Sequence, residues 1–287
     1  MAHDTVSFSG MLSPSRINRW RECQQRAKYI YIDGKKAPPY AALKYGSAWD
    51  LFQTHQEEGF FVLKNKEGHS LTPSQSADLF ARFWDEQKDE VEDWKDDKPE
   101  ELMDIGVQAA KRWTKEVGDR YIAKAIQKDF QLLLGDGTWG YRGILDLVLV
   151  GEEGKATKED LEPVVHDAKT SGKSWSARKI AQQLQPAAYS IAVKHEPKLK
   201  ELEVSEDRFV FDVHVKTKVP KIQIVNVDVT EADRNGFLKM LHATREQMKF
   251  SEEKGVFLPN RESMLCSRKW CPFWQECEKE WGGKVPE

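Results

Sequence analysis

Residues 138–170, TWGYRGILDLVLVGEEGKATKEDLEPVVHDAKT, decide the fold of this chain. The two ends of this stretch are rich in apolar and β-branched residues, and the middle is polar and contains glycine, which is typical of two neighbouring strands. Each apolar end also contains charged residues. Asp146 lies in the first end, and Asp167 and Lys169 lie in the second. Residues i and i+2 of a strand share a face, so Asp167 and Lys169 are predicted to project together.

The neighbouring strand can bring Asp146 to the same place, and Ala168 presents a backbone carbonyl between the two charged residues of its strand. Two carboxylates and a carbonyl suit Mg²⁺ or Mn²⁺, which prefer oxygen ligands. A metal-bound water facing Lys169 suits phosphodiester hydrolysis, since the metal lowers the pKa of the water and the lysine positions it or stabilises the transition state. The alternative is that these are ordinary residues near the ends of strands.

Working outward, apolar periodicity and capping signals predict helices over 13–31, 45–58, 72–94, 99–128, 177–194 and 230–253, and strands over 130–134, 138–150, 163–170, 208–216 and 221–229. The strands are predicted to form one sheet. The fold class is therefore α/β (α+β), a central mixed β-sheet flanked by helices. We expect a single domain over 1–287, with a helical N-terminal region at 1–129, a core at 130–253 and a C-terminal cysteine segment at 254–287.

The four cysteines are Cys23 near the start of the chain and Cys266, Cys271 and Cys277 near its end. Cys23 falls on the predicted helix 13–31, and the other three follow C-x4-C-x5-C. Four thiols are the number that a structural zinc or an iron–sulfur cluster needs, so they predict a clasp joining the two ends. Two disulfides are the alternative, which a reducing compartment disfavours.

No stretch of the 287 residues is apolar enough to cross a membrane, and the first ten, MAHDTVSFSG, lack the pattern of a secretory signal. We therefore expect a cytoplasmic protein with no membrane partner. The net charge of −3 gives no overall sign of nucleic-acid binding. Charge is nevertheless segregated, since 85–104 is strongly acidic and 168–195 contains five Lys or Arg and no acid.

The order of the motifs resembles the RecB-like branch of the PD-(D/E)xK nuclease superfamily. The matching segments are Leu12-Ser13-Pro14-Ser15, Gly46-Ser47-Ala48, the GILD that ends at Asp146, Asp167-Ala168-Lys169, the Q-x3-Y motif from Gln185 to Tyr189, and the cysteine triplet. Within that branch the chain is most similar to iron-staple nucleases, namely AddB-type nuclease domains and CRISPR adaptation nucleases. The resemblance implies a restriction-endonuclease-like core and a 4Fe-4S cluster held by the four cysteines, with zinc as the alternative at this spacing.

Two further groups of residues gain an expected role from this context. Gln185 and Tyr189 lie four apart on one helix face, and could orient the catalytic lysine or touch a substrate phosphate; ordinary helix packing is the alternative. Trp175 lies in a basic segment with Lys173, Arg178 and Lys179. There the ring could stack on an unpaired base while the cations contact phosphates, and burial of the tryptophan in the core is the alternative.

One position departs from the family pattern. The family usually has a metal-binding His four positions after the helix glycine, and this chain has Asp50 there, after Gly46. An aspartate also ligates Mg²⁺, so we expect Asp50 to be a third metal ligand, with Glu57 a weaker candidate.

The residues and the resemblance together predict a Mg²⁺- or Mn²⁺-dependent deoxyribonuclease. The resemblance further implies an exonuclease that acts on DNA ends or single-stranded DNA in recombination, repair or replication. The chain has no G-x4-G-K-[S/T] motif, so unwinding would need a helicase or recombination protein as partner. The alternatives are a non-catalytic DNA-end binding module, or an interaction subunit of a recombination or CRISPR adaptation complex that docks through the acidic run.

Overall fold

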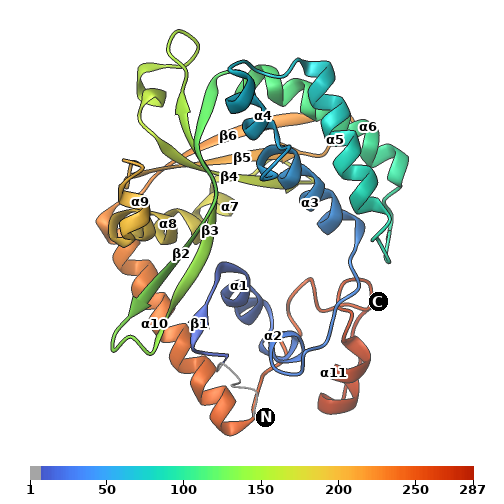
Figure 1. Cartoon of the computed structure of the whole chain (residues 1–287). Coiled ribbons are helices and arrows are strands. Elements are labelled where there is room, and N and C mark those ends of the chain that lie inside the picture. The colour runs from blue at the N-terminus through green and yellow to red at the C-terminus, as the bar shows by residue number, and fades with distance from the viewer. Residues whose placement is uncertain (1–7) are drawn as a thin grey trace, which may run out of the picture. The chain divides into compact units, whose positions relative to one another are not determined.

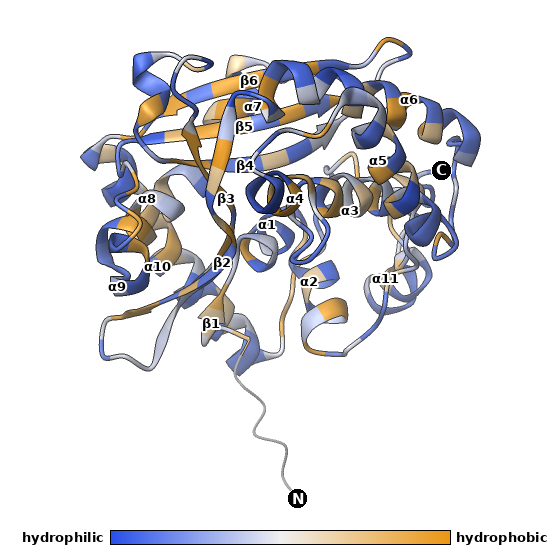
Figure 2. Ribbon diagram, turned by 45° about the horizontal axis from the view of Figure 1, so that its top comes forward, coloured by the Kyte–Doolittle hydropathy of each residue, from blue (hydrophilic) through white to orange (hydrophobic). Residues whose placement is uncertain are grey.

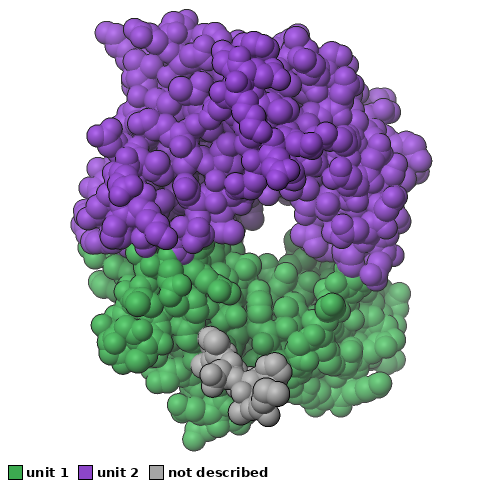
Figure 3. Space-filling view, in the orientation of Figure 1, with its two compact units in different colours: residues 1–38, 131–143, 235–287 green, residues 39–130, 144–234 purple. Residues whose placement is uncertain are grey.

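The computed structural model of the protein describes residues 8–287. Residues 1–7, on which most of the prediction of a signal-free N-terminus rests, lie outside the described part. The chain divides into two compact units (Figure 3). Unit 1 contains the described residues up to 38 together with 131–143 and 235–287, and unit 2 contains 39–130 and 144–234. All the predicted catalytic residues fall in unit 2, and all four cysteines fall in unit 1.

The strands that carry Asp146, Asp167 and Lys169 belong to one mixed sheet. Its strands are β1 (Met11–Leu12), β2 (Tyr121–Leu134), β3 (Trp139–Gly151), β4 (Val164–Ser171), β5 (Arg208–Val215) and β6 (Lys221–Asp228). The order is β1-β3-β4-β5-β6, and β2 also pairs with β3. The β1–β3 and β4–β5 pairs are parallel, whereas β3–β4 and β5–β6 are antiparallel. The predicted fold class, a mixed sheet with flanking helices, is confirmed.

The helices of unit 2 pack around this sheet (Figure 1). They are α3 (Ala41–Thr54), α4 (Phe60–Glu67), α5 (Pro73–Lys88), α6 (Pro99–Trp113), a π-helical turn η1 (Thr114–Gly118), a 3₁₀ turn η2 (Lys158–Leu161), α7 (Ala177–Ala181), α8 (Gln185–His195) and α9 (Pro197–Lys200). Helices α3 to α6 enclose one hydrophobic core with Leu147 and Leu149 of β3, and fully buried rings such as Trp49, Trp84 and Trp113 dominate it. Burial of such large rings is a main source of folding free energy.

The alternation of β5 separates two faces of the sheet. Asp212 receives a hydrogen bond from the indole of Trp113 on α6, and His214, two residues later, contacts the ring of Tyr45 on α3. Phe209 and Phe211, which alternate with them, contact Tyr189 of α8 and Trp175 respectively. Successive strand residues point to opposite faces, so helices cover both sides and the strands are largely hydrophobic (Figure 2).

Unit 1 contains the two ends of the chain. Its helices are α1 (Pro14–Glu22), α2 (Gln24–Tyr31), most of α10 (Glu231–Lys254) and α11 (Trp274–Trp281). The single helix predicted over 13–31 is wrong, because the backbone is extended at Cys23 (φ −168°, ψ 113°) and divides it into α1 and α2. Cys23 therefore lies at a break between two helices and not within one.

Two other helix predictions also need correction. The helix predicted over 99–128 ends at Trp113. A π-helical turn follows it, and β2 begins at Tyr121. The helix predicted over 177–194 is divided into α7 and α8, between which Leu184 precedes the new helix. In both places tertiary pairing or a turn overrides local helical propensity.

The capping signals were more reliable than the helix lengths. Ser13 caps α1 through its side chain, and Thr72 forms a capping box with Gln75 at the start of α5. Thr230 and Asp233 exchange the same pair of hydrogen bonds at the start of α10. None of the helices in the described part of the chain is long and apolar enough to cross a membrane.

Candidate active site and thiol pocket

Antiparallel pairing of β3 with β4 places the two predicted catalytic carboxylates together. Leu147 pairs with His166, and extension of this register by one residue puts Asp146 opposite Asp167. The backbone N–H of Ala168 donates to Asp146 Oδ2 at 3.3 Å, which fixes the first carboxylate against the second strand. The sequence prediction that these strands bring Asp146 and Asp167 to one place agrees with this geometry.

Lys169 lies on the same side of β4 as Asp167, as the strand alternation predicts. Its Nζ forms an ion pair with Asp167 Oδ2 and donates to the carbonyl oxygen of Ala168 at 3.2 Å. The Asp167 side chain is only 2% exposed, whereas that of Lys169 is 27% exposed. The lysine is therefore anchored by a buried carboxylate and remains accessible to a bound molecule.

Three acidic groups interact electrostatically at this site. Burial is the largest influence on Asp146 and raises its pKa well above the usual value, and the charges of Asp167 and Asp50 add to this effect. Burial also raises the pKa of Asp50, with the Thr54 hydrogen bond and Lys169 acting against it. Burial alone would lower the pKa of Lys169, but the nearby carboxylates outweigh burial and raise it.

The donor set fits a hard divalent cation. Asp50, Asp146 and Asp167 supply three carboxylates against the single cation of Lys169, and such an excess of buried negative charge is relieved by a bound metal ion. Within residues 8–287, no three His, Cys, Asp or Glu side chains already converge as ligands of one ion. The acids are thus neighbours that would have to close around a metal.

Sequence reasoning missed two residues that hold Asp50. The Thr54 hydroxyl donates to Asp50 Oδ1 at 3.3 Å, and Gln127 Nε2 donates to the same oxygen at 3.4 Å. Thr54 follows Asp50 by four residues on α3, a spacing that could have revealed it. Gln127 comes from β2, where its backbone has a positive φ of 49°, and no sequence pattern connects it with Asp50.

The predicted helper residues lie on α8 and near α7. Tyr189 is buried, and its ring packs between Phe130 and Phe209 at centroid distances of 5.7 and 5.8 Å. Gln185 stands at the start of α8, and its Oε1 is buried without a hydrogen-bond partner. A buried amide oxygen with no partner is unfavourable, so it is available to a ligand or a water molecule.

The basic segment lies beside the catalytic strand. Trp175 is half-buried, and its ring packs on Phe211 at 5.0 Å; Phe211 is the β5 partner of Asp167. Gln223 of β6 holds the Trp175 backbone, because its Oε1 accepts from Trp175 N–H at 2.7 Å and its Nε2 donates to the Trp175 carbonyl oxygen at 3.0 Å. Lys179 lies 5.6 Å from the indole, and Lys173, Arg178 and Lys179 are all exposed.

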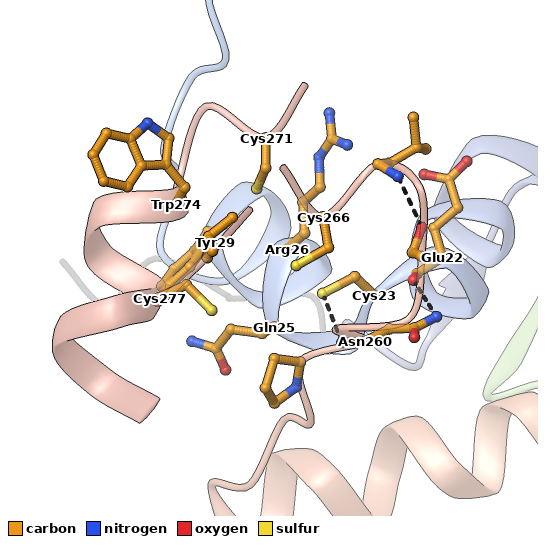
Figure 4. A pocket seen from close by; sticks show the side chains of 14 residues that line it. Glu22, Cys23, Gln25, Arg26, Tyr29, Asn260, Cys266, Cys271, Trp274 and Cys277 are labelled. Atoms are coloured by element: carbon orange, nitrogen blue, oxygen red, sulfur yellow. Dashed lines mark hydrogen bonds between the residues drawn. The ribbon is translucent and has the colours of Figure 1, made fainter. Parts of the chain in front are cut away.

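The four cysteines line one pocket of unit 1 (Figure 4), although within residues 8–287 no three of these thiols are arranged to hold one metal ion. Cys23 comes from the break between α1 and α2, Cys266 and Cys271 come from the loop before α11, and Cys277 lies on α11. Tyr29, Phe273 and Cys277 form a small hydrophobic cluster behind the pocket. The prediction that the cysteines bring the two ends of the chain together agrees with this placement.

Backbone and side-chain donors surround the thiols. The N–H of Asn260 donates to Cys23 Sγ at 3.5 Å, and Arg261 Nη2 donates to Cys277 Sγ at 3.7 Å. Burial raises the pKa of the Cys266, Cys271 and Cys277 thiols, whereas Arg261 acts in the opposite direction on Cys266 and Cys277. Four thiols with N–H donors form a donor set that fits a soft metal or a cluster.

Comparison with known proteins identifies the family. The profile of the PD-(D/E)XK nuclease superfamily matches residues 11–278. A crystal structure named as a "putative exonuclease" from Eubacterium rectale is similar to this chain, with a TM-score of 0.52 and 13% identity over 92% of this chain and 90% of that one. At this identity the likeness concerns the fold alone.

A second solved structure, SSO0001, has 10% identity over 97% of this chain and 88% of that one, with a TM-score of 0.39, which is too low to define a shared fold. No curated protein matches the chain. The family match covers nearly the whole sequence, so the chain belongs to the PD-(D/E)XK nuclease superfamily. Membership supports nuclease activity on DNA, and nucleases of this superfamily typically use Mg²⁺ or Mn²⁺.

Proposed function

We propose that this protein is a Mg²⁺- or Mn²⁺-dependent deoxyribonuclease, an exonuclease that acts on DNA ends or single-stranded DNA. The observation that carries the proposal is the contact of Lys169 with both the Asp167 carboxylate and the Ala168 carbonyl, beside Asp146. A lysine within reach of two oxygen groups that suit a hard cation is the arrangement that hydrolysis of a phosphodiester needs.

In this proposal the metal is held by Asp146 and Asp167, with Asp50 and the Ala168 carbonyl as further ligands. A bound divalent ion supplies a water of lowered pKa and offsets the charge of the phosphate. Lys169, held by Asp167, keeps its positive charge at neutral pH, because the surrounding carboxylates raise its pKa. It can therefore donate to the attacking water or to a phosphate oxygen as charge develops in the transition state.

The residues around this centre have proposed roles in binding. Gln185 directs its buried amide oxygen toward a hydrogen-bond donor, either the lysine or a nucleotide, and Tyr189 supports it from the same helix. Lys173, Arg178 and Lys179 contact the phosphates of DNA. The exposed part of the half-buried Trp175 ring offers a surface for a base to stack on.

We assign the thiol pocket to a 4Fe-4S cluster, as in the iron-staple branch of the superfamily. All four cysteines line one pocket, and each thiolate of such a cluster binds its own iron, so the sulfur atoms need not converge on one point. Zinc would require such convergence. Protein purified without oxygen should be brown, with about four iron and four sulfide per chain. A colourless protein that contains zinc would contradict this assignment.

The proposed cellular setting comes from the sequence resemblance alone. A cytoplasmic location, a role in recombination, repair or replication, and a helicase or recombination protein as partner all follow from the resemblance to RecB-like nucleases. The proposed nuclease activity can be tested separately from this setting, because hydrolysis by the isolated protein can be measured without any partner.

The test is cleavage of end-labelled single- and double-stranded DNA, with Mg²⁺, with Mn²⁺ and with a chelator. Lys169→Ala should lower the rate by about 10²-fold or more, a typical loss for a group that stabilises charge in the transition state. Lys198→Ala, an exposed lysine on α9, is the matched control and should cleave normally. Wild-type rates for Lys169→Ala would overturn the mechanism, and DNA binding without cleavage by the wild type would instead indicate a non-catalytic binding module.

A further inference from the structure

Two arginines lie among the four thiols of unit 1. Arg26 of α2 and the cysteines line the same pocket, and its side chain is drawn beside them in Figure 4. Arg261 follows Asn260 in the loop after α10, and its Nη2 donates both to Cys277 Sγ at 3.7 Å and to the carbonyl oxygen of Gly282 at 2.9 Å. Gly282 ends α11, so Arg261 connects a thiol with the C-terminal turn of the helix that carries it.

Two acids near the pocket are already paired with other cations. Glu22, the one acid among the residues that line the pocket, forms an ion pair with Arg19 at 2.7 Å. Glu280 lies near Lys28, at 3.5 Å, and accepts hydrogen bonds from Gln25 and Tyr29. The guanidinium of Arg261 therefore faces sulfur and a backbone carbonyl, and its charge is available to an anionic group in the pocket.

Asn260 adds a donor on the other side of the pocket. Its backbone N–H reaches Cys23 Sγ at 3.5 Å, and its side-chain amide donates to the carbonyl of Glu22 at 3.0 Å. Two consecutive residues thus donate to the first and the last cysteine of the chain. Hydrogen bonds to ligand sulfur atoms are among the features that set the stability and reduction potential of a metal–sulfur centre.

We propose that Arg261, supported by Arg26, is a positioning residue for an anionic metal–thiolate centre, which it stabilises by donating to the Cys277 sulfur and by offsetting the charge of the ligands. A centre with four thiolate ligands carries net negative charge whether it contains zinc or a 4Fe-4S cluster. The inference rests on the proposed function in that some metal must bind the thiols. It concerns the retention of that metal and is independent of DNA cleavage.

The test compares Arg261→Gln, Arg261→Lys and Arg245→Gln in the full-length protein, reconstituted with iron and sulfide without oxygen. Arg245 is also in unit 1, where it pairs with Glu246 and lies 4.7 Å from the ring of Trp139, so its replacement removes the same charge away from the thiols. The measurements are the release of iron to a chelator, followed by absorbance, and the reduction potential of the centre. Circular dichroism checks that each variant is folded.

Arg261→Gln should hold iron about tenfold or more less tightly than the wild type, as expected for loss of a group that contacts a ligand. Its reduction potential should become more negative, because a positive donor near sulfur favours the reduced, more anionic state. The iron retention and reduction potential of Arg261→Lys should lie between those of the wild type and Arg261→Gln. Arg245→Gln should match the wild type in both. Equal retention and equal potential in Arg261→Gln and Arg245→Gln would overturn the role of Arg261 while leaving the cluster assignment intact.

The same comparison with zinc separates this inference from the choice of metal. A wild-type protein that binds zinc and not iron would contradict the proposed cluster, and a tenfold weaker zinc affinity of Arg261→Gln would still support the role of Arg261. Wild-type protein that binds neither metal would overturn both proposals.

Discussion

At the scale of single residues, Asp50 has the most informative environment. The sequence resemblance predicts a His at its position, and the Asp50 carboxylate is held by Thr54 and Gln127. The charges of Lys169 and Asp167 act on its pKa in opposite directions, Lys169 lowering it and Asp167 raising it. Asp50 is therefore electrostatically coupled to the catalytic carboxylates and Lys169, although it is not the His that the resemblance predicts.

We expect Asp50→Asn to weaken metal binding and so to raise the Mg²⁺ concentration that cleavage requires. Loss of one of three carboxylates lowers the attraction for a divalent cation, so half-maximal cleavage should need about tenfold more Mg²⁺, a difference of about 1.4 kcal/mol. Titration of Mg²⁺ in a cleavage assay measures this. Glu58→Gln, an exposed acid just beyond α3 that pairs with Arg82, is the control, and an unchanged Mg²⁺ dependence in Asp50→Asn would exclude Asp50 as a ligand.

A second residue, Asp212, gives a prediction about pH. Burial raises its pKa to about 7, against opposing hydrogen bonds from Trp113 and Gln53. Its pKa in the unfolded chain is about 3.9, so between that value and about 7 only the folded state holds the proton. The stability contributed by protonated Asp212 is therefore complete at low pH and is lost as pH rises through about 7, with a slope of at most about 1.4 kcal/mol per pH unit.

Asp212→Asn should remove this slope and raise the stability of the protein above pH 7, because an amide bears no charge to bury. Urea unfolding at pH 5 and pH 8, with the free energy of unfolding compared between wild type and variant, measures both effects. Parallel pH dependences in the two proteins would show that Asp212 does not titrate in this window.

At the scale of elements, the packing of α5 against α6 depends on a glycine. A Cβ added at Gly106 would lie 1.9 Å from Cε1 of Phe80, whose ring is fully buried. Gly106→Ala should therefore destabilise the protein by about 1–3 kcal/mol in urea unfolding, the usual cost of overpacking. The double variant Gly106→Ala with Phe80→Leu should recover part of the lost stability. Gly236→Ala on α10, where nothing lies within 4 Å of the added Cβ, should be neutral or slightly stabilising.

The elements also show what the sequence could predict. The caps at Ser13, Thr72 and Thr230 were correct because they are local hydrogen bonds. The break at Cys23 was missed because it depends on residues far away in sequence: Gln25 N–H donates to the carbonyl of Leu258, and the side chain of Gln24 accepts from Leu258 N–H. These bonds replace those of a continuous helix, and no local pattern announces them.

The candidate site was predictable to a similar extent. Strand alternation and pairing explain why Asp146, Asp167 and Lys169 come together, since both are properties of short segments. Gln127 could not be found in this way, because the segment that contains it was predicted to be helical. Residues 121–128 have apolar positions that also suit a helix, and pairing of β2 with β3 decides between the two possibilities.

At the scale of the whole molecule, the chain contributes its two ends to unit 1 and most of its middle to unit 2. The prediction of a single domain over 1–287 remains a proposal about how the protein folds and acts. The two units contain different candidate sites, so the thiols and the carboxylates can be altered independently. The effect of each on stability and on chemistry can then be measured separately.

Cys271→Ala should destabilise unit 1 before it alters hydrolysis. In the proposed cluster, loss of a ligand would weaken the link between α2 and the loop before α11, because metal binding contributes folding free energy directly. Hydrogen exchange should therefore become faster at residues 14–31 and 258–281, while the aromatic core around Trp49 and Trp113 keeps its protection. Met264→Ala, an exposed residue of the same loop and not a metal ligand, is the control. Equal loss of protection in both units would show that they unfold together, and an immediate loss of cleavage with unchanged protection would give the thiols a part in the chemistry.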